Sequence, residues 1–79
     1  MEDELQNTLK VQRAIRNLTQ ADLADLAGVT RKSVNAIETG KMTPSVLLAL
    51  RLARALGVSV DALFMLAQPP EVTRGRRSK

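Results

Sequence analysis

The sequence predicts an all-α fold of five helices in one small domain. Three observations lead to this prediction. Apolar residues recur at helical spacing, no segment alternates apolar and polar residues long enough for a strand, and capping residues divide the chain into helix-sized pieces. The chain has 79 residues and one aromatic side chain, so its core must consist of Leu, Val, Ile, Ala and Met. Such a core is thin, and domains of this size often gain stability from a second subunit.

The first two helices are expected between residues 8 and 28. Thr8 is the candidate N-cap of a first helix that runs to about Asn17. Thr19 starts the second helix, with Asp22 three residues later as a capping-box acid near the positive helix end. Gly28 ends it, because glycine tolerates the left-handed conformation that closes many helices.

The third and fourth helices follow the same logic. Thr30 caps a third helix that runs from Arg31 to about Glu38. Pro44 fits the first turn of a fourth helix, where its missing N–H has no intrahelical partner to lose. This helix is expected to end at Gly57.

The fifth helix completes the expected domain. Ser59 caps it, and it continues through Leu66. We expect a folded domain over residues 7–68, preceded by an acidic extension of residues 1–6. Residues 69–79 form a basic tail that has no apolar periodicity, so we expect this tail to be disordered.

The composition argues against most catalytic chemistry. The chain has no Cys and no His, so it lacks disulfides, zinc fingers, thiol nucleophiles and imidazole acid–base groups. Its four glycines are scattered and form no phosphate-cradling loop. The longest apolar run, Val46–Leu50, is far shorter than the roughly 20 residues of a membrane-spanning helix. We expect a cytoplasmic, nucleoid-associated protein that is not an enzyme and holds no cofactor or metal.

The charge balance favours a polyanionic partner. Twelve Lys and Arg against eight Asp and Glu give a net charge of +4 and a pI near 10.4. Residues 5–68 alone hold eight bases and four acids, so the basicity is not confined to the tail. Such a balance is typical of nucleic-acid binding, although a solvated basic surface gives the same count.

The fourth helix indicates a homodimer. Apolar residues cover nearly every direction around its axis, which is typical of a helix buried all round. A domain this small cannot bury such a helix alone, so the surplus predicts a subunit interface; a generously packed monomer core is the alternative. The candidate interface residues are Leu47, Leu50, Leu63, Met65 and Leu66.

The second and third helices form a helix-turn-helix pattern. Small or apolar residues stand where the two helices must approach, at Ala24, Gly28, Val34 and Ile37. The outer face of the third helix is then left to polar residues, namely Arg31, Lys32, Ser33 and Asn35. A helix fits the DNA major groove, where Arg and Lys reach guanine O6 and N7, and Asn can pair with adenine N6 and N7.

Three motifs carry a family resemblance. Residues 19–24 (TQADLA), residues 28–41 (GVTRKSVNAIETGK) and residues 56–58 (LGV) resemble the Xre family of helix-turn-helix regulators, the family of the lambdoid phage Cro and CI repressors. The short chain is similar to the compact single-domain prokaryotic members. The resemblance spans about residues 7–66 and implies a lambda-repressor-like domain that binds double-stranded DNA and regulates transcription.

The resemblance also implies residue roles. Arg31 and Lys32 match the principal base-reading positions, at one of which the family often has Gln, and Asn35 is a secondary base-reading candidate. Arg13 and Glu38 match a structural salt bridge between the first and third helices. The expected contacts with the DNA backbone are Gln20, Thr30, Ser33 and Lys41, and Gln20 is also expected to buttress the third helix.

Several functions are compatible with this pattern. The leading prediction is a repressor that binds an inverted-repeat operator as a homodimer. One alternative is an antitoxin or adaptor that binds a protein partner and regulates its own expression. Another is a controller of restriction–modification genes. The basic tail fits either the DNA backbone or a solubilising role.

Overall fold

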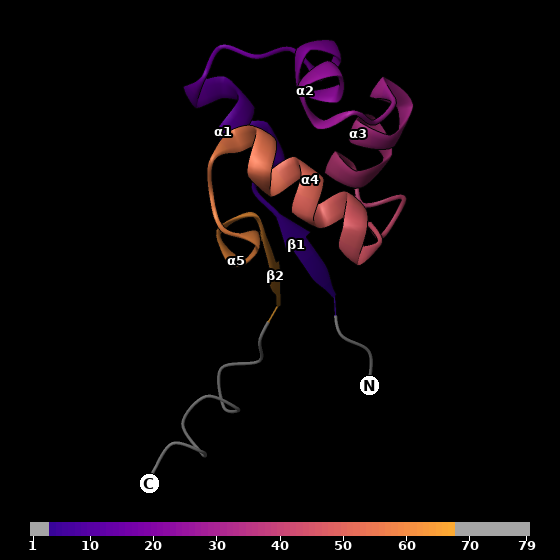
Figure 1. The fold of residues 1–79 in the computed structure, drawn as a ribbon. Helices are drawn as coiled ribbons and strands as arrows, with labels where there is room; N and C mark the ends of the chain where they lie inside the picture. The colour runs from indigo at the N-terminus through magenta and orange to yellow at the C-terminus, as the bar shows by residue number, and fades with distance from the viewer. Residues whose placement is uncertain (1–3, 68–79) are drawn as a thin grey trace, which may run out of the picture.

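The structure, a computed structural model, describes residues 4–67. Helices α2 and α3 lie together at one end of the molecule, and the two strands lie on the other side of α4 (Figure 1). The expected five-helix domain is confirmed, with a small two-stranded sheet added to it. The expected basic tail, residues 69–79, lies outside the described residues. The elements are β1 (Leu5–Asn7), α1 (Leu9–Ile15), α2 (Gln20–Ala27), α3 (Arg31–Glu38), α4 (Val46–Leu56), α5 (Val60–Leu63) and β2 (Phe64–Leu66).

Helix α2 has the predicted cap at each end. The Thr19 hydroxyl accepts from Asp22 N at 3.0 Å, and the Asp22 carboxylate accepts from Thr19 N at 3.0 Å, which completes the capping box. Gly28 ends the helix at φ 72°, in the left-handed region. Helix α1 stops at Ile15, earlier than expected, and Asn17 takes φ 56° in the turn. Asparagine tolerates this conformation better than most residues.

The start of helix α1 differs from the prediction. The Thr8 side chain makes no capping bond, because its hydroxyl donates to the carbonyl of Ala62 at 2.9 Å. Asn7 takes the capping role, and its Oδ1 accepts from Leu9 N at 3.1 Å. The chain before α1 is therefore held by a distant segment that a local pattern does not reveal.

The start of helix α4 also differs. Pro44 was expected in its first turn, but the helix begins at Val46 and Ser45 is the N-cap. The Ser45 hydroxyl accepts from Leu48 N at 3.1 Å, which satisfies one of the unpaired N–H groups at the helix start. Pro44 thus precedes the helix instead of entering it.

One continuous core joins the helices and the sheet. Helix α4 crosses the middle of the domain and contacts α2, and α2 contacts α3. None of the helices over residues 4–67 combines the length and the hydropathy of a membrane-spanning segment. The buried residues are Leu9, Leu23, Ala24, Ala27, Val34, Ile37, Ala49, Leu52, Ala53, Leu56, Leu63 and Phe64.

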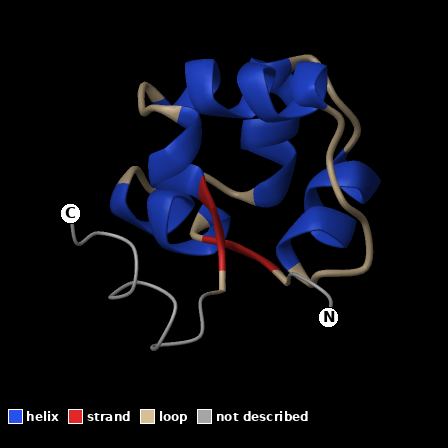
Figure 2. Cartoon of the chain, turned by 90° about the horizontal axis from the view of Figure 1, so that it is seen from below, coloured by secondary structure: helices blue, strands red, loops and turns tan. Residues whose placement is uncertain are grey.

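The two-stranded sheet was not predicted. The fifth helix was expected to continue through Leu66, but it ends at Leu63, and Phe64 is extended at φ −127° and ψ 137°. Strand β2 pairs with β1 in antiparallel register, with Leu5 opposite Leu66 (Figure 2). This pairing takes residues 5 and 6 into the folded domain, so the acidic extension is shorter than expected. Strands of three residues are too short to show an alternating pattern.

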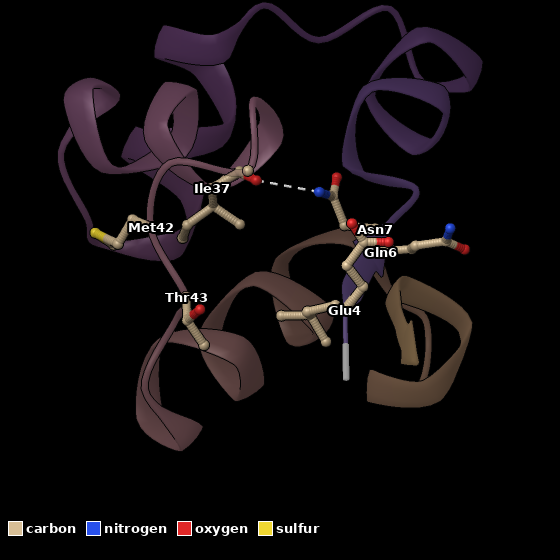
Figure 3. A pocket seen from close by; sticks show the side chains of 8 residues that line it. Glu4, Gln6, Asn7, Ile37, Met42 and Thr43 are labelled. Atoms are coloured by element: carbon tan, nitrogen blue, oxygen red, sulfur yellow. Dashed lines mark hydrogen bonds between the residues drawn. The ribbon is translucent and has the colours of Figure 1, made fainter. Parts of the chain in front are cut away.

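Asn7 links the sheet to helix α3. Its Nδ2 donates to the carbonyl of Ile37 at 3.1 Å, across a hollow between β1 and the chain after α3 (Figure 3). The hollow has a volume of about 400 Å³. One side chain therefore caps α1 and also holds the end of α3.

Candidate nucleic-acid interface

Helix α3 has one buried face and one polar exposed face. Val34 is fully buried and Ile37 is 2% exposed, so both lie in the core. Arg31, Lys32 and Asn35 are exposed and lie within one turn of each other. Within residues 4–67, no ion pair or hydrogen bond engages the side chain of Arg31 or Lys32. The structure thus brings the three predicted base-reading residues together on an outward face.

An ion pair fixes α3 to α1. Arg13 Nε donates to Glu38 Oε2 at 2.6 Å, and Arg13 Nη2 donates to Glu38 Oε1 at 3.0 Å. The two side chains are only 15% and 6% exposed. Arg13 Nη1 also donates to the carbonyl of Leu18 at 3.0 Å, so the guanidinium holds the α1–α2 turn as well. This bidentate geometry matches the structural salt bridge that the family resemblance implies.

The environment of Glu38 keeps it ionised. Burial raises the pKa of Glu38, but hydrogen bonds from Arg13 and Gln20 outweigh this effect, helped by the charges of Arg13 and Lys10. The net result is a pKa of Glu38 below its ordinary value. The hydrogen bond to Glu38 likewise raises the pKa of Arg13. Near neutral pH, Glu38 is therefore an ionised carboxylate, which accepts hydrogen bonds and donates none.

Gln20 connects this ion pair to the exposed face. Its Nε2 donates to Glu38 Oε1 at 3.1 Å and to Asn35 Oδ1 at 3.1 Å. Both hydrogens of the amide are used inside the protein, so Gln20 Nε2 buttresses α3 and has no hydrogen left for a phosphate. The main-chain N–H of Gln20 remains, because the first N–H groups of a helix have no intrahelical partner.

A hollow lies beside the start of α2. It has a volume of about 480 Å³ and is lined by residues of α1, α2 and α3 and of the turn between α1 and α2. The start of α2, which carries a partial positive charge, and the cationic residue Arg31 both line this hollow. Its chemistry suits an anionic oxygen. The lining residues are Arg13, Leu18, Thr19, Gln20, Ala21 and Arg31.

The other predicted backbone contacts lie around α3. The Thr30 hydroxyl accepts from Ser33 N at 3.0 Å and donates to Ser33 Oγ at 2.9 Å, so it is committed to capping α3. This arrangement leaves the hydroxyl proton of Ser33 free to donate outward. Lys41 is exposed in the turn that follows α3, where its N donates to the carbonyl of Ala36 at 2.8 Å.

Helix α4 is buried on one face only. Ala49, Leu52, Ala53 and Leu56 are in the core, and the single chain leaves the other apolar side chains of α4 partly or largely exposed, which is the surplus on which the dimer prediction rests. Of the predicted interface residues, Leu47, Leu50 and Leu66 are 58%, 52% and 52% exposed, and Met65 is half-buried. Leu63 is fully buried within the domain, so it cannot contact a second subunit. Val46, an apolar residue of the same helix that was not among the predicted interface residues, is 76% exposed.

Sequence reasoning missed Asn7. It lies at the expected edge of the domain, and its bond to Ile37 spans 30 positions of the chain. A local signal was present, because an Asn side chain can accept a hydrogen bond from the backbone N–H two residues later, as Asn7 does from Leu9. The link from Gln20 to Asn35 was likewise not foreseen in its atomic form.

The comparisons with known proteins agree with this geometry. The helix-turn-helix family model HTH_3 matches residues 9–63, and the chain belongs to this family. An HTH-type transcriptional regulator of Methanocaldococcus jannaschii is 46% identical over 61 residues, which cover 77% of this chain and 92% of that protein. The regulator YgzD of Bacillus subtilis is 38% identical over 64 residues, covering 81% and 97% of the two chains.

Solved structures give the same result. The restriction–modification controller protein C.AhdI of Aeromonas hydrophila superposes with a TM-score of 0.66 and 33% identity, over 68% of this chain and 82% of that chain. A protein from Bacteroides fragilis has a TM-score of 0.68 over 77% of this chain and 98% of that chain, at 24% identity, and supports the fold alone. The resemblance to the Xre and Cro/CI regulators is confirmed at the level of the family.

Proposed function

We propose that this protein is a transcriptional repressor that binds a specific sequence of double-stranded DNA as a homodimer. The observation that carries this proposal is the outward face of α3, where Arg31, Lys32 and Asn35 are exposed while the opposite face is locked into the core. An α-helix fits the major groove, and its exposed N-terminal residues meet the base edges. Arg31 and Lys32 are the principal base contacts, with guanine O6 and N7 as their targets.

The DNA backbone is contacted on both sides of α3. A phosphate fits the hollow beside the start of α2, with the main-chain N–H of Gln20 as donor. Lys41, which follows the C-terminal end of α3, supplies a further phosphate contact, and the hydroxyl of Ser33 within α3 supplies another. Such contacts fix the position of the protein on the duplex and leave sequence discrimination to the base edges. The Thr30 side chain caps α3, so Thr30 contacts the DNA backbone through its main chain.

The homodimer uses the exposed apolar side chains of α4 and the second strand. Leu47, Leu50 and Leu66 together expose apolar surface that a second copy would cover. Two-fold symmetry makes the operator an inverted repeat, and the two copies of α3 must lie about 34 Å apart, one turn of DNA, to enter successive major grooves on the same side of the duplex. A dimer bound at a promoter then blocks the polymerase sterically.

A second candidate is the control of restriction–modification genes. The specific observation is the similarity to C.AhdI, at 33% identity and a TM-score of 0.66. This role uses the same DNA-binding surface and differs only in the genes it controls. The two candidates are separated by whether the selected DNA sequence lies upstream of a restriction–modification operon or of other genes.

The proposal is tested by selecting binding sites from a pool of random duplex DNA. We expect the enriched sequences to be inverted repeats with half-site centres about 10 base pairs apart. Enrichment of single half-sites without symmetry would contradict the homodimer. A pool without any enriched sequence would contradict sequence-specific DNA binding. The antitoxin or adaptor hypothesis would then lead to a search for a protein partner.

A further inference from the structure

The side chains of Arg13, Glu38, Gln20 and Asn35 form one chain of hydrogen bonds from the interior to the exposed face of α3. It starts at the Arg13–Glu38 ion pair, passes through Gln20 Nε2 and ends at Asn35 Oδ1. We call this set the polar relay. Only its last member, Asn35, is exposed on the face that is proposed to enter the DNA.

Each bond in the polar relay has only one possible direction. Because Arg13 only donates, the Glu38 carboxylate must accept from it, and its oxygens must accept from Gln20 too. The Gln20 amide therefore turns its NH₂ group toward Glu38. The same NH₂ group faces Asn35, which must present its oxygen. Turning Asn35 over would place two NH₂ groups against each other, and turning Gln20 over would place an oxygen against the carboxylate.

We propose that the polar relay makes Asn35 a hydrogen-bond donor to the DNA, and that it selects guanine over adenine at the base pair it contacts. This inference rests on the proposed function. Asn35 Oδ1 already accepts from Gln20, while within residues 4–67 no bond engages Asn35 Nδ2. Guanine offers two adjacent acceptors, O6 and N7, in the major groove, whereas adenine places its N6 amino group beside N7. A side chain whose NH₂ group points outward matches guanine and meets a second donor at adenine.

Glu38 and Gln20 are positioning residues in this scheme. Neither needs to touch the DNA, yet both determine which base Asn35 prefers. The amino-acid type alone predicts a preference for adenine, because an asparagine without internal hydrogen bonds pairs with adenine through both its oxygen and its NH₂ group. The polar relay thus changes the specificity expected of an exposed asparagine.

The experiment compares binding-site selections for the wild-type protein, N35A, E38Q and D61N. The N35A variant identifies the base pair that Asn35 contacts, because the preference at that pair is lost. There we expect the wild type to prefer guanine to adenine by about tenfold. In E38Q the amide at position 38 can donate or accept, so Gln20 is free to turn over and the guanine-to-adenine ratio falls toward one. The preferences at the pairs contacted by Arg31 and Lys32 stay unchanged.

A control variant and an alternative test variant complete the experiment. D61N removes one negative charge from the exposed start of α5, away from the polar relay, and should keep the wild-type ratio. If E38Q does not fold by circular dichroism, Q20A removes the link while leaving the ion pair intact, and the same loss of the ratio is expected. A preference for adenine in the wild type, or an unchanged ratio in folded Q20A, overturns the inference.

A measurement without DNA tests the relay separately. In the ¹⁵N-labelled free protein, we expect the side-chain NH₂ protons of Gln20 to exchange with water more slowly than those of Asn35, because both Gln20 hydrogens are bonded internally. Equal exchange overturns the orientation of the polar relay. A selection that enriches no sequence overturns the proposed function, while slow Gln20 exchange then still supports the orientation.

Discussion

Arg13 and Glu38 lie 25 positions apart in the sequence and join helix α1 to helix α3 through hydrogen bonds of 2.6 and 3.0 Å. Because Glu38 is 6% exposed, removal of its partner leaves a charge with little access to water. We expect R13M to lower the free energy of unfolding by about 3 kcal/mol. Urea denaturation measures this loss. The control R54M, at an exposed position of α4, should change stability by less than about 0.5 kcal/mol. Equal losses in both variants would show that the ion pair adds nothing.

Acid should destabilise the fold through Glu38 and Asp22. Hydrogen bonds from Arg13 and Gln20 hold the pKa of Glu38 low against the effect of burial, and the Thr19 backbone N–H holds the pKa of Asp22 low. Carboxylates with lowered pKa values contribute stability that is present above their unfolded values, near 4.5 and 3.8, and is lost as the pH falls through the folded values. Unfolding midpoints measured from pH 7 down to pH 3 should fall less steeply in E38Q than in the wild type. An identical slope would exclude Glu38 as a source of the loss.

Gly28 ends α2 with φ 72°, and a Cβ built there would meet no atom within 4 Å. The cost of G28A is therefore backbone strain alone, and we expect a loss of about 1 kcal/mol of stability. The matched variant is N17G, because Asn17 has φ 56° and glycine relieves the strain there. Thermal unfolding should thus shift downward in G28A and not in N17G. A stable G28A would mean that the turn can adopt another conformation.

Arg31 and Lys41 should differ in the way their loss affects DNA binding. Both are exposed, but Arg31 lies in the first turn of α3 and Lys41 lies in the turn after it. We expect R31A to lose about 1–3 kcal/mol on the selected duplex and to lose discrimination at one base pair of each half-site. K41A should weaken all duplexes alike and reduce the salt slope by about one. Fluorescence anisotropy at several salt concentrations separates these outcomes. Uniform loss in R31A would make Arg31 a phosphate contact.

The proposed homodimer interface on α4 is tested by introducing negatively charged side chains there. Leu47 and Leu50 are 58% and 52% exposed, so L47E and L50E should leave the fold of the single chain intact. We expect the wild type to sediment as a dimer and both variants to sediment as monomers at the same concentration. L26E is the matched control, since Leu26 is 61% exposed on α2. Dissociation in L26E, with intact dimers in L47E and L50E, would move the interface to α2.

The helices of this fold were predictable because their signals are local. The capping box at Thr19 and Asp22 and the glycine after α2 are short-range patterns, and the structure contains both. The strands were not predictable, because Leu5 pairs with Leu66 across nearly the whole described chain. A three-residue strand has too few buried residues to give a recognisable sequence pattern, and it is stabilised mainly by pairing with its partner strand.

The polar face of α3 was also predictable, whereas its internal hydrogen bonds were not. The spacing of Val34 and Ile37 determines which side of α3 is buried and thus where Arg31 and Lys32 lie. The bond from Gln20 to Asn35 depends on how two helices cross, which composition and periodicity do not specify. The same limit applies to Leu63, whose apolar side chain fits an interface or a core equally well and is buried in the core.

The proposed function depends on the ability of α3 to distinguish one DNA sequence from others. The most direct measurement is the ratio of affinities for the selected duplex and a scrambled duplex of the same composition, determined over a range of salt concentrations. We predict a ratio of at least about 10³ at physiological salt, with both affinities falling as salt rises. Equal affinities, vanishing together at higher salt, would contradict the claim and leave only charge attraction between a basic protein and DNA.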